Sequence, residues 1–186
     1  MTGKQILSSS DGVRVWCPGR PRTKGSLKPA HVKMGPGRCR VSLTESGGHS
    51  TDWKLAMIGA VREQCEVSGY AGAVEVHAFF RFAASTGQQR HIEAHAAATD
   101  PHAFCPCPWP VEAAGAYAHG DEDKLRRNVL DALTQAGLIK DDALVIGGQN
   151  WKRFTRNVTE DAGVLIVVEP ARDVERVLEM ERSWIR

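Results

Sequence analysis

The residues Gly120–Phe154, GDEDKLRRNVLDALTQAGLIKDDALVIGGQNWKRF, carry the strongest structural signal of the chain. Apolar side chains recur at helical spacing over Asp121–Ala136, and Gly137 supplies a C-terminal stop, so this part predicts a helix. The segment Ala143–Phe154 reads as a strand that is interrupted by two consecutive glycines. An amphipathic helix followed at once by a strand indicates a domain in which helices pack against a sheet.

Other parts of the chain show the same helical and strand periods. Strands are expected within Gly12–Pro18, Ala73–Ala83 and Val164–Val168, a β-hairpin within Ala30–Leu43, and further helices over Ser50–Val67 and after Pro170. Residues 84–119 have neither period, so we expect them to form a long loop insertion. The sequence therefore predicts one α/β (α+β) domain over residues 1–186, in which a small mixed sheet packs with helices.

Length and composition place the chain among ordinary globular proteins. Its 186 residues, 42% of them hydrophobic, suffice for one domain with a core. It has no run of about 18 apolar residues, and its polar start lacks a secretory signal, so we expect a cytoplasmic protein. Five cysteines, an odd number, indicate reduced thiols rather than a disulfide framework.

The small net charge of +2 hides an uneven distribution. Basic residues are frequent in Met1–Arg40, where Asp11 is the only acid, whereas acids crowd residues 121–142. This division suits a metal-dependent enzyme acting on a polyanion, because basic side chains neutralise phosphates and carboxylates hold a cation. A solvated surface with uneven charge is the alternative, and composition alone does not decide between them.

Four aspartates are the candidate metal ligands. Asp121 and Asp123 share a side only if Asp121 is extended and Asp123 opens the helix. Acids are also favoured at a helix N-terminus, so capping explains one of them without catalysis. Asp141 and Asp142 follow the helix, and we expect a short connection to return them beside the first pair. Carboxylates gathered in this way would need a cation, and oxygen ligands select Mg²⁺ or Mn²⁺, which can activate a water for attack on a phosphodiester.

Two basic residues lie near these acids in the expected helix. Arg127 follows Asp123 by four residues and so shares its face, where it can stabilise the negative charge of a transition state. Lys124 can contact DNA phosphate. From spacing alone, ordinary surface ion pairs, each worth roughly 0.3–0.5 kcal/mol, are the more common explanation of both residues.

A longer motif contains all of these residues. It comprises Gly120-Asp121-Glu122-Asp123-Lys124-Leu125, Arg127, Leu130-Asp131-Ala132-Leu133, Ala136-Gly137-Leu138-Ile139 and Asp141-Asp142-Ala143-Leu144-Val145. In order and spacing it resembles the RusA family of Holliday junction resolvases, whose pattern is D-x-D-[NK]-L-x-[KR], then D-A-L, a Gly, and D-D-x-x-V. The basic turn Gly19–Lys24 also resembles one that these proteins carry near their start.

The resemblance implies a small, dimeric α/β enzyme of bacterial or phage origin that cuts four-way DNA junctions with Mg²⁺. It implies that Asp121, Asp123 and Asp142 are the essential acids, and that Arg127 stands at the position of the catalytic lysine. Arginine keeps the charge and binds phosphate in a bidentate manner, but it cannot donate a proton. An electrostatic role is therefore expected for Arg127.

Dimerisation and DNA contacts follow from the same expectation. A four-way junction has near two-fold symmetry, and a two-fold dimer would present two identical sites to it. The exposed basic segment is expected to hold the DNA backbone through Arg20, Arg22, Lys24 and Lys28, together with Lys124 of the helix.

The expected insertion contains several histidine and cysteine residues that could ligate Zn²⁺. They are His91, His95, His102, Cys105, Cys107 and His119. Cys-x-Cys is not the usual spacing of a zinc knuckle, so we do not expect a structural Zn²⁺.

Two other functions remain open at this point. The same acids could serve a nuclease acting on replication forks or flaps. Alternatively, the chain could bind DNA junctions without cutting them, in which case the acids merely cap a helix.

Overall fold

The computed structural model describes residues 3–23, 27–35, 38–45, 48–102, 105, 121–171 and 182. Its strands are β1 (Gln5–Ile6), β2 (Val13–Pro18), β3 (Leu27–Gly35), β4 (Arg38–Glu45), β5 (Cys65–Glu66), β6 (Val74–Phe82), β7 (Val145–Gly147), β8 (Asn150–Phe154) and β9 (Gly163–Pro170). Its helices are α1 (Gly48–Gln64), α2 (Thr86–Ala98), α3 (Glu122–Ala136) and the 3₁₀ helix η2 (Asp142–Leu144).

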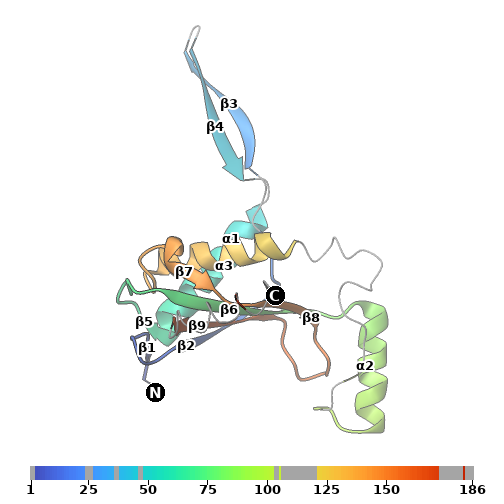
Figure 1. The fold of residues 1–186 in the computed structure, drawn as a ribbon. Coiled ribbons are helices and arrows are strands. Elements are labelled where there is room, and N and C mark those ends of the chain that lie inside the picture. The colour runs from blue at the N-terminus through green and yellow to red at the C-terminus, as the bar shows by residue number, and fades with distance from the viewer. Residues whose placement is uncertain are drawn as a thin grey trace.

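A five-stranded mixed sheet forms the centre of the fold (Figure 1). Strand β9 lies between β2 and β6 and is antiparallel to both. The free side of β6 is paired with β7 near its start and with β8 further along, both in parallel. The chain is therefore an α+β protein with a mixed sheet, as the sequence predicts.

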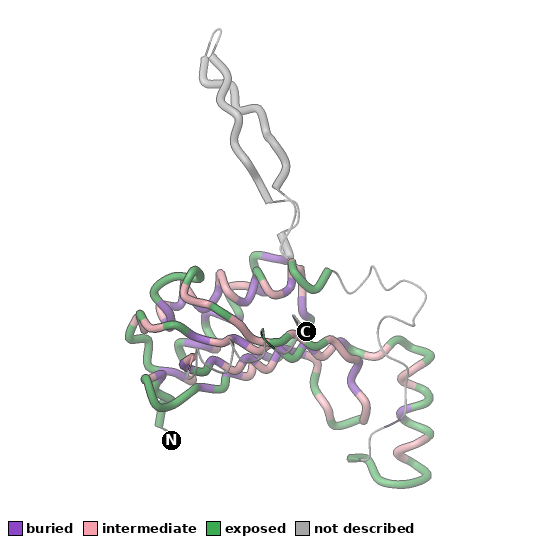
Figure 2. Tube along the Cα trace, viewed as in Figure 1, coloured by how far each residue is buried: buried purple, intermediate pink, exposed green. Residues whose placement is uncertain are grey.

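One face of this sheet is buried beneath α1 and α3, which pack against each other (Figures 1 and 2). Alternate residues of β6, from Val74 to Phe82, point into this layer and are at most 2% exposed. Helix α3 contributes the apolar stripe that its sequence predicts, including Leu125, Val129 and Leu133. Its C-terminus is fixed by Gly137, which adopts φ +83° in the left-handed region.

The insertion is only partly a loop. Residues 86–98, expected to be irregular, form α2, so that expectation is wrong there. The helix begins with a capping box, in which Ser85 accepts a hydrogen bond from the Gln88 N–H and the Gln88 side chain accepts one from the Ser85 N–H. Only Ile92 of α2 is buried, against Cys105 and Ala84, which explains why no apolar periodicity announces the helix.

The expected hairpin is confirmed by β3 and β4, which pair with each other in an antiparallel register. Among the strands that the structure describes, neither pairs with any other. The ribbon of the hairpin extends away from the central layers (Figure 1). The helix expected after Pro170 lies outside the described residues, apart from Ala171 and Arg182.

The outer edge of β2 is hydrogen-bonded by two glutamine side chains. Gln5 donates from Nε2 to the Arg14 carbonyl at 2.6 Å, and its Oε1 accepts from the Arg14 N–H at 2.7 Å. Gln64 bonds in the same two-way fashion to the N–H and carbonyl of Trp16, at 3.0 and 2.8 Å. Each amide thus replaces one residue of a missing neighbouring strand.

Two further expectations concern the membrane and the thiols. None of the helices in the described part of the chain is long and apolar enough to cross a membrane. Cys17 and Cys65 are free thiols in the core, and Cys105 is buried as well. Burial raises the pKa of Cys17 to about 11.

Candidate functional site

The start of α3 has the local geometry that the two-residue spacing of its acids requires. Asp121 precedes the helix with φ −71° and ψ 141°, an extended conformation, and Asp123 lies in the first turn. The Asp121 side chain makes no capping hydrogen bond to the helix. Capping therefore does not explain Asp121, and its carboxylate lies at the surface with 60% of the side chain exposed.

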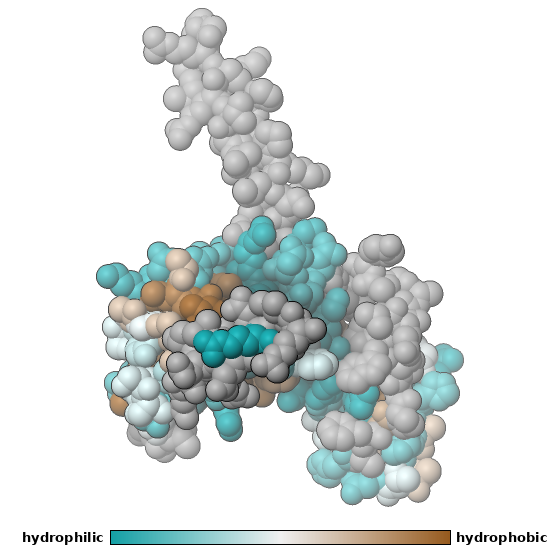
Figure 3. Space-filling view, viewed as in Figure 1, coloured by the Kyte–Doolittle hydropathy of each residue, from teal (hydrophilic) through white to brown (hydrophobic). Residues whose placement is uncertain are grey.

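A lysine one turn further along binds this carboxylate. Lys124 Nζ lies 2.7 Å from Asp121 Oδ2. The hydrogen bond and the positive charge of Lys124 hold the pKa of Asp121 below its ordinary value, and the same contact raises the pKa of Lys124. The charges of Asp123 and Arg127 both act on Lys124, in opposite directions, so acids and bases share one exposed surface. Figure 3 shows hydrophilic side chains gathered over this part of α3.

Strand β8 adds residues that the sequence did not single out. Lys152 helps to lower the pKa of Asp121 through its charge. Asn150 Nδ2 donates a short hydrogen bond to Glu122 Oε1. Arg126 donates to two carbonyls before β8, those of Gly147 at 2.9 Å and Gly148 at 3.3 Å. These contacts fix the beginning of β8 beside the first two turns of α3.

The basic segment is joined to the same helix by a buried amide. Asn128, which is 1% exposed, donates from Nδ2 to the Arg22 carbonyl at 3.1 Å. Arg20 is exposed and Arg22 half-buried, so the first part of the expected DNA-binding segment lies against α3. The expected contacts through Lys24 and the side chain of Lys28 lie outside the described residues. Asn128 was not singled out from the sequence, because its position in the helical repeat lies on the same face as the apolar residues.

Asp141 and Asp142 do not return to the first pair of acids within one chain. Helix α3 has 15 residues, so its ends are about 22 Å apart. The sheet gives a similar separation: Val145, just after the 3₁₀ helix, pairs with Val74, whereas Lys152, near Asp121, pairs with Phe80. These positions on β6 lie about 20 Å apart. Figure 1 shows β7 and β8 at opposite ends of β6.

The expectation that one chain gathers all four carboxylates is therefore wrong. It assumed that the chain doubles back directly after Gly137, but the backbone first runs beside Tyr70, with hydrogen bonds from Tyr70 N to Leu138 O and from Lys140 N to Tyr70 O. Asp141 Oδ1 accepts a hydrogen bond from the Ala143 N–H at 2.8 Å and caps the 3₁₀ helix. The residues that the structure describes contain no group of three His, Cys, Asp or Glu able to hold a metal ion.

The same holds for those of the histidine and cysteine residues considered as possible zinc ligands that the structure describes. His95 contacts Thr99 Oγ1, His102 contacts Thr159 Oγ1, and Cys105 is buried. Cys107 and His119 lie outside the described residues.

The site thus has two parts, a pair of acids among cations at the start of α3 and a second pair at its far end. Comparison of the chain with known protein families finds no match, and comparison with curated proteins finds none either.

Proposed function

We propose that this chain is a Mg²⁺-dependent, structure-specific endodeoxyribonuclease that resolves four-way DNA junctions by paired nicks as a homodimer. The observation that carries the proposal is the exposed pair Asp121 and Asp123, set among Lys124, Arg127 and Lys152 at the start of α3. Carboxylates beside cations are what a site for metal-assisted phosphodiester cleavage needs, because the cations hold the phosphate that the acids alone would repel. The motif that resembles the RusA family supports the same function.

The side chains present fit a hard divalent cation. Asp121 and Asp123 offer exposed oxygen ligands, and Mg²⁺ is commonly bound by one or two carboxylates, with waters and substrate phosphate as its other ligands. When bound, the ion would lower the pKa of a coordinated water and so supply a nucleophile. Lys124 pairs with Asp121, and this contact would loosen when the acids take a cation.

The remaining work falls to the basic residues. Lys124 and Lys152, which lie near Asp121, would bind phosphates of the substrate. Arg127, which is exposed and four residues from Asp123, would stabilise the negative charge that develops on the oxygens of the attacked phosphate. A guanidinium does not release its proton at ordinary pH, so the proton for the leaving oxygen has to come from water.

A homodimer also resolves the separation of the acids. Asp142 precedes Val145 at one end of β6, whereas Asp121 lies near Lys152, about 20 Å further along that strand. A second copy therefore has to bring its Asp142 to Asp121 and Asp123 if all three serve one ion. A two-fold axis then creates two such composite sites, as paired nicks require.

The test is cleavage of a synthetic four-way junction in Mg²⁺ or Mn²⁺, with Ca²⁺ as the ion that permits binding but not cutting. We expect wild-type protein to nick the junction and Asp123→Asn to lose nicking while still binding it. Asp52→Asn, an exposed acid on α1, is the matched control and should nick normally. Equal nicking by wild type and Asp123→Asn would refute the assignment. Parallel reactions with forks and flaps identify the preferred branch.

A junction-binding protein without catalysis is the second candidate. It is favoured by the ion pair between Lys124 and Asp121, which a purely structural role of the acid also explains. This candidate predicts junction binding that divalent cations do not change, and no nicking with any metal.

A further inference from the structure

The sheet face opposite α1 and α3 carries a row of large apolar side chains. Trp16 of β2 is opposite Leu165 of β9, Leu165 is opposite Phe79 of β6, and Phe79 is opposite Trp151 of β8. The four residues therefore form one line across four strands, spanning about 14 Å. All four occupy strand positions whose side chains point away from the buried layer beneath α1 and α3.

The outer half of this row is open to solvent. Phe79 is 36% exposed and Trp151 is 53% exposed, although both are large aromatic residues. Together with Phe80 and Arg153 they line a hollow of about 210 Å³. Aromatic rings that lie side by side on a sheet with one face exposed are available for stacking.

Arginines form the next row along the strands. Arg81 of β6 is opposite Arg153 of β8, two residues beyond Phe79 and Trp151. Both guanidinium groups bind Glu160: Arg81 Nη1 lies 3.4 Å from Oε1, and Arg153 contacts both carboxylate oxygens. One carboxylate therefore balances two positive charges. The hydrogen bonds hold both side chains against the sheet.

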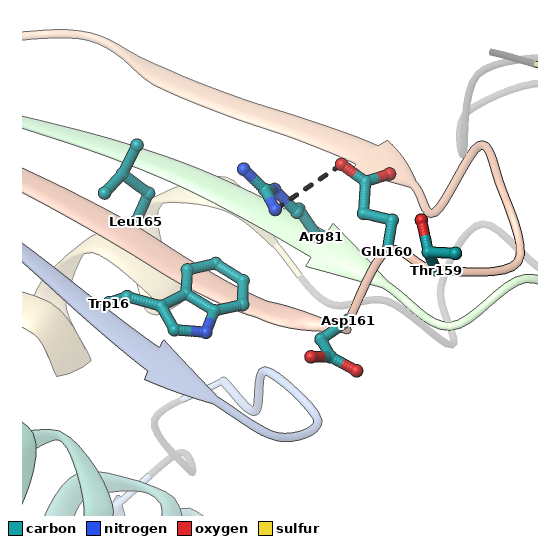
Figure 4. Close-up of a pocket in the computed structure, with 6 residues that line it drawn as sticks. All are labelled: Trp16, Arg81, Thr159, Glu160, Asp161 and Leu165. Carbon is teal, nitrogen blue, oxygen red and sulfur yellow. Dashed lines mark ion pairs between the residues drawn. The ribbon is translucent and has the colours of Figure 1, made fainter. Parts of the chain in front are cut away.

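Figure 4 shows how this arginine row meets the aromatic row. Arg81 lies over the ring of Trp16, with its guanidinium carbon 4.7 Å from the ring centre. A second hollow of about 370 Å³ on the same face is lined by Trp16, Arg81, Thr159, Glu160, Asp161 and Leu165. The face thus combines stacking surfaces with two guanidinium groups that are fixed beside the carboxylates of Glu160 and Asp161.

We propose that this face binds an unpaired strand of DNA, with bases stacked on Trp151 and Phe79 and phosphates held near Arg153 and Arg81. Proteins bind single strands without sequence preference through aromatic platforms beside basic side chains, because every base has a π-face and every nucleotide a phosphate. Adjacent rows on a strand are about 7 Å apart, which places aromatic and basic groups within one extended nucleotide of each other. The surface is separate from the acids of α3, which belong to the opposite layer.

The experiment measures fluorescence anisotropy of a labelled oligothymidylate of about twenty nucleotides with the full chain in EDTA, which prevents cleavage. We expect binding that weakens about tenfold in Trp151→Ala and in Phe79→Ala, and that Trp151→Phe restores, because phenylalanine retains a stacking surface. Leu55→Ala removes a 58% exposed apolar residue from α1 and should bind as wild type does.

Several outcomes overturn the proposal. Wild-type protein that fails to bind the oligonucleotide overturns it. Equal affinities for wild type, Trp151→Ala and Phe79→Ala also overturn it, as does a preference for duplex of the same length. Asp123→Asn, which tests the nuclease site, should bind the oligonucleotide normally, so failure of either proposal is recognised separately.

Discussion

A heterodimer of two inactive variants tests whether the candidate site is shared between two copies of the chain. One copy carries Asp123→Asn and the other Asp142→Asn. In a shared site, Asp123 of one copy works with Asp142 of the other. One of the two sites in the heterodimer then contains both substitutions, and the other site contains neither and is intact.

The expected magnitude follows from the spacing of the acids. Mg²⁺ binds oxygen ligands at about 2.0–2.1 Å, so carboxylates about 20 Å apart on one chain cannot share it. A heterodimer with one intact site should nick four-way junctions at about half the wild-type rate per dimer, whereas each homodimeric variant should not. Its product should be a singly nicked junction rather than a resolved one, because the second site is inactive.

The assay uses two affinity tags, one on each variant, so that only heterodimers survive successive purification steps. Nicked and resolved products are then separated by electrophoresis in native and denaturing gels. A heterodimer of Asp121→Asn with Asp123→Asn is the matched control, because both substitutions lie at the same end of α3 and disable both sites in any arrangement. Inactivity of the first heterodimer, alongside an active wild-type dimer carrying the same tags, would refute the shared site.

Two further predictions concern stability. Burial alone would raise the pKa of Glu160, but its hydrogen bonds and the charges of Arg153 and Arg81 hold the pKa below the ordinary value. The ionised Glu160 therefore stabilises the fold fully above about pH 4.5, and this stabilisation is lost as the pH falls through the lowered pKa. The free energies of unfolding of wild type and Glu160→Gln, measured in urea, should differ at pH 7 and converge in acid. A difference that stays constant with pH would contradict this. Gly148→Ala should lower the free energy of unfolding by about 3 kcal/mol or more, because Gly148 has φ +112° and a Cβ there would lie 1.9 Å from the Val76 carbonyl oxygen. Gly59→Ala is the control: a Cβ at that position has no atom within 4 Å, so the same measurement should show a neutral or slightly stabilising effect.

Periodicity was a sound guide wherever one face of an element is buried. Helix α3 and strand β6 were predicted with nearly their observed ends, because each has a clear apolar stripe against the core. Helix α2 escaped prediction because it buries only Ile92, and its single strong signal is the capping box at Ser85. Local capping chemistry was thus more informative there than hydrophobic spacing.

Only the part of the candidate site at the start of α3 was predictable from the sequence. The extended backbone at Asp121 and the shared surface of Asp123 and Arg127 follow from spacing within a few residues. The position of Asp142 depends on the path after the helix, and the approach of Lys152 depends on the parallel register of β8 with β6. Neither is encoded in a short motif, since register is decided by the whole sheet.

The glutamine amides along β2 limit how this protein can associate. An unoccupied strand edge invites a strand from another molecule, and uncontrolled addition of that kind leads to aggregates. Because Gln5 and Gln64 already occupy the N–H and carbonyl groups of Arg14 and Trp16, strand addition on that side has to displace both amides. Growth of an open-ended fibre by strand addition is thereby disfavoured on that edge.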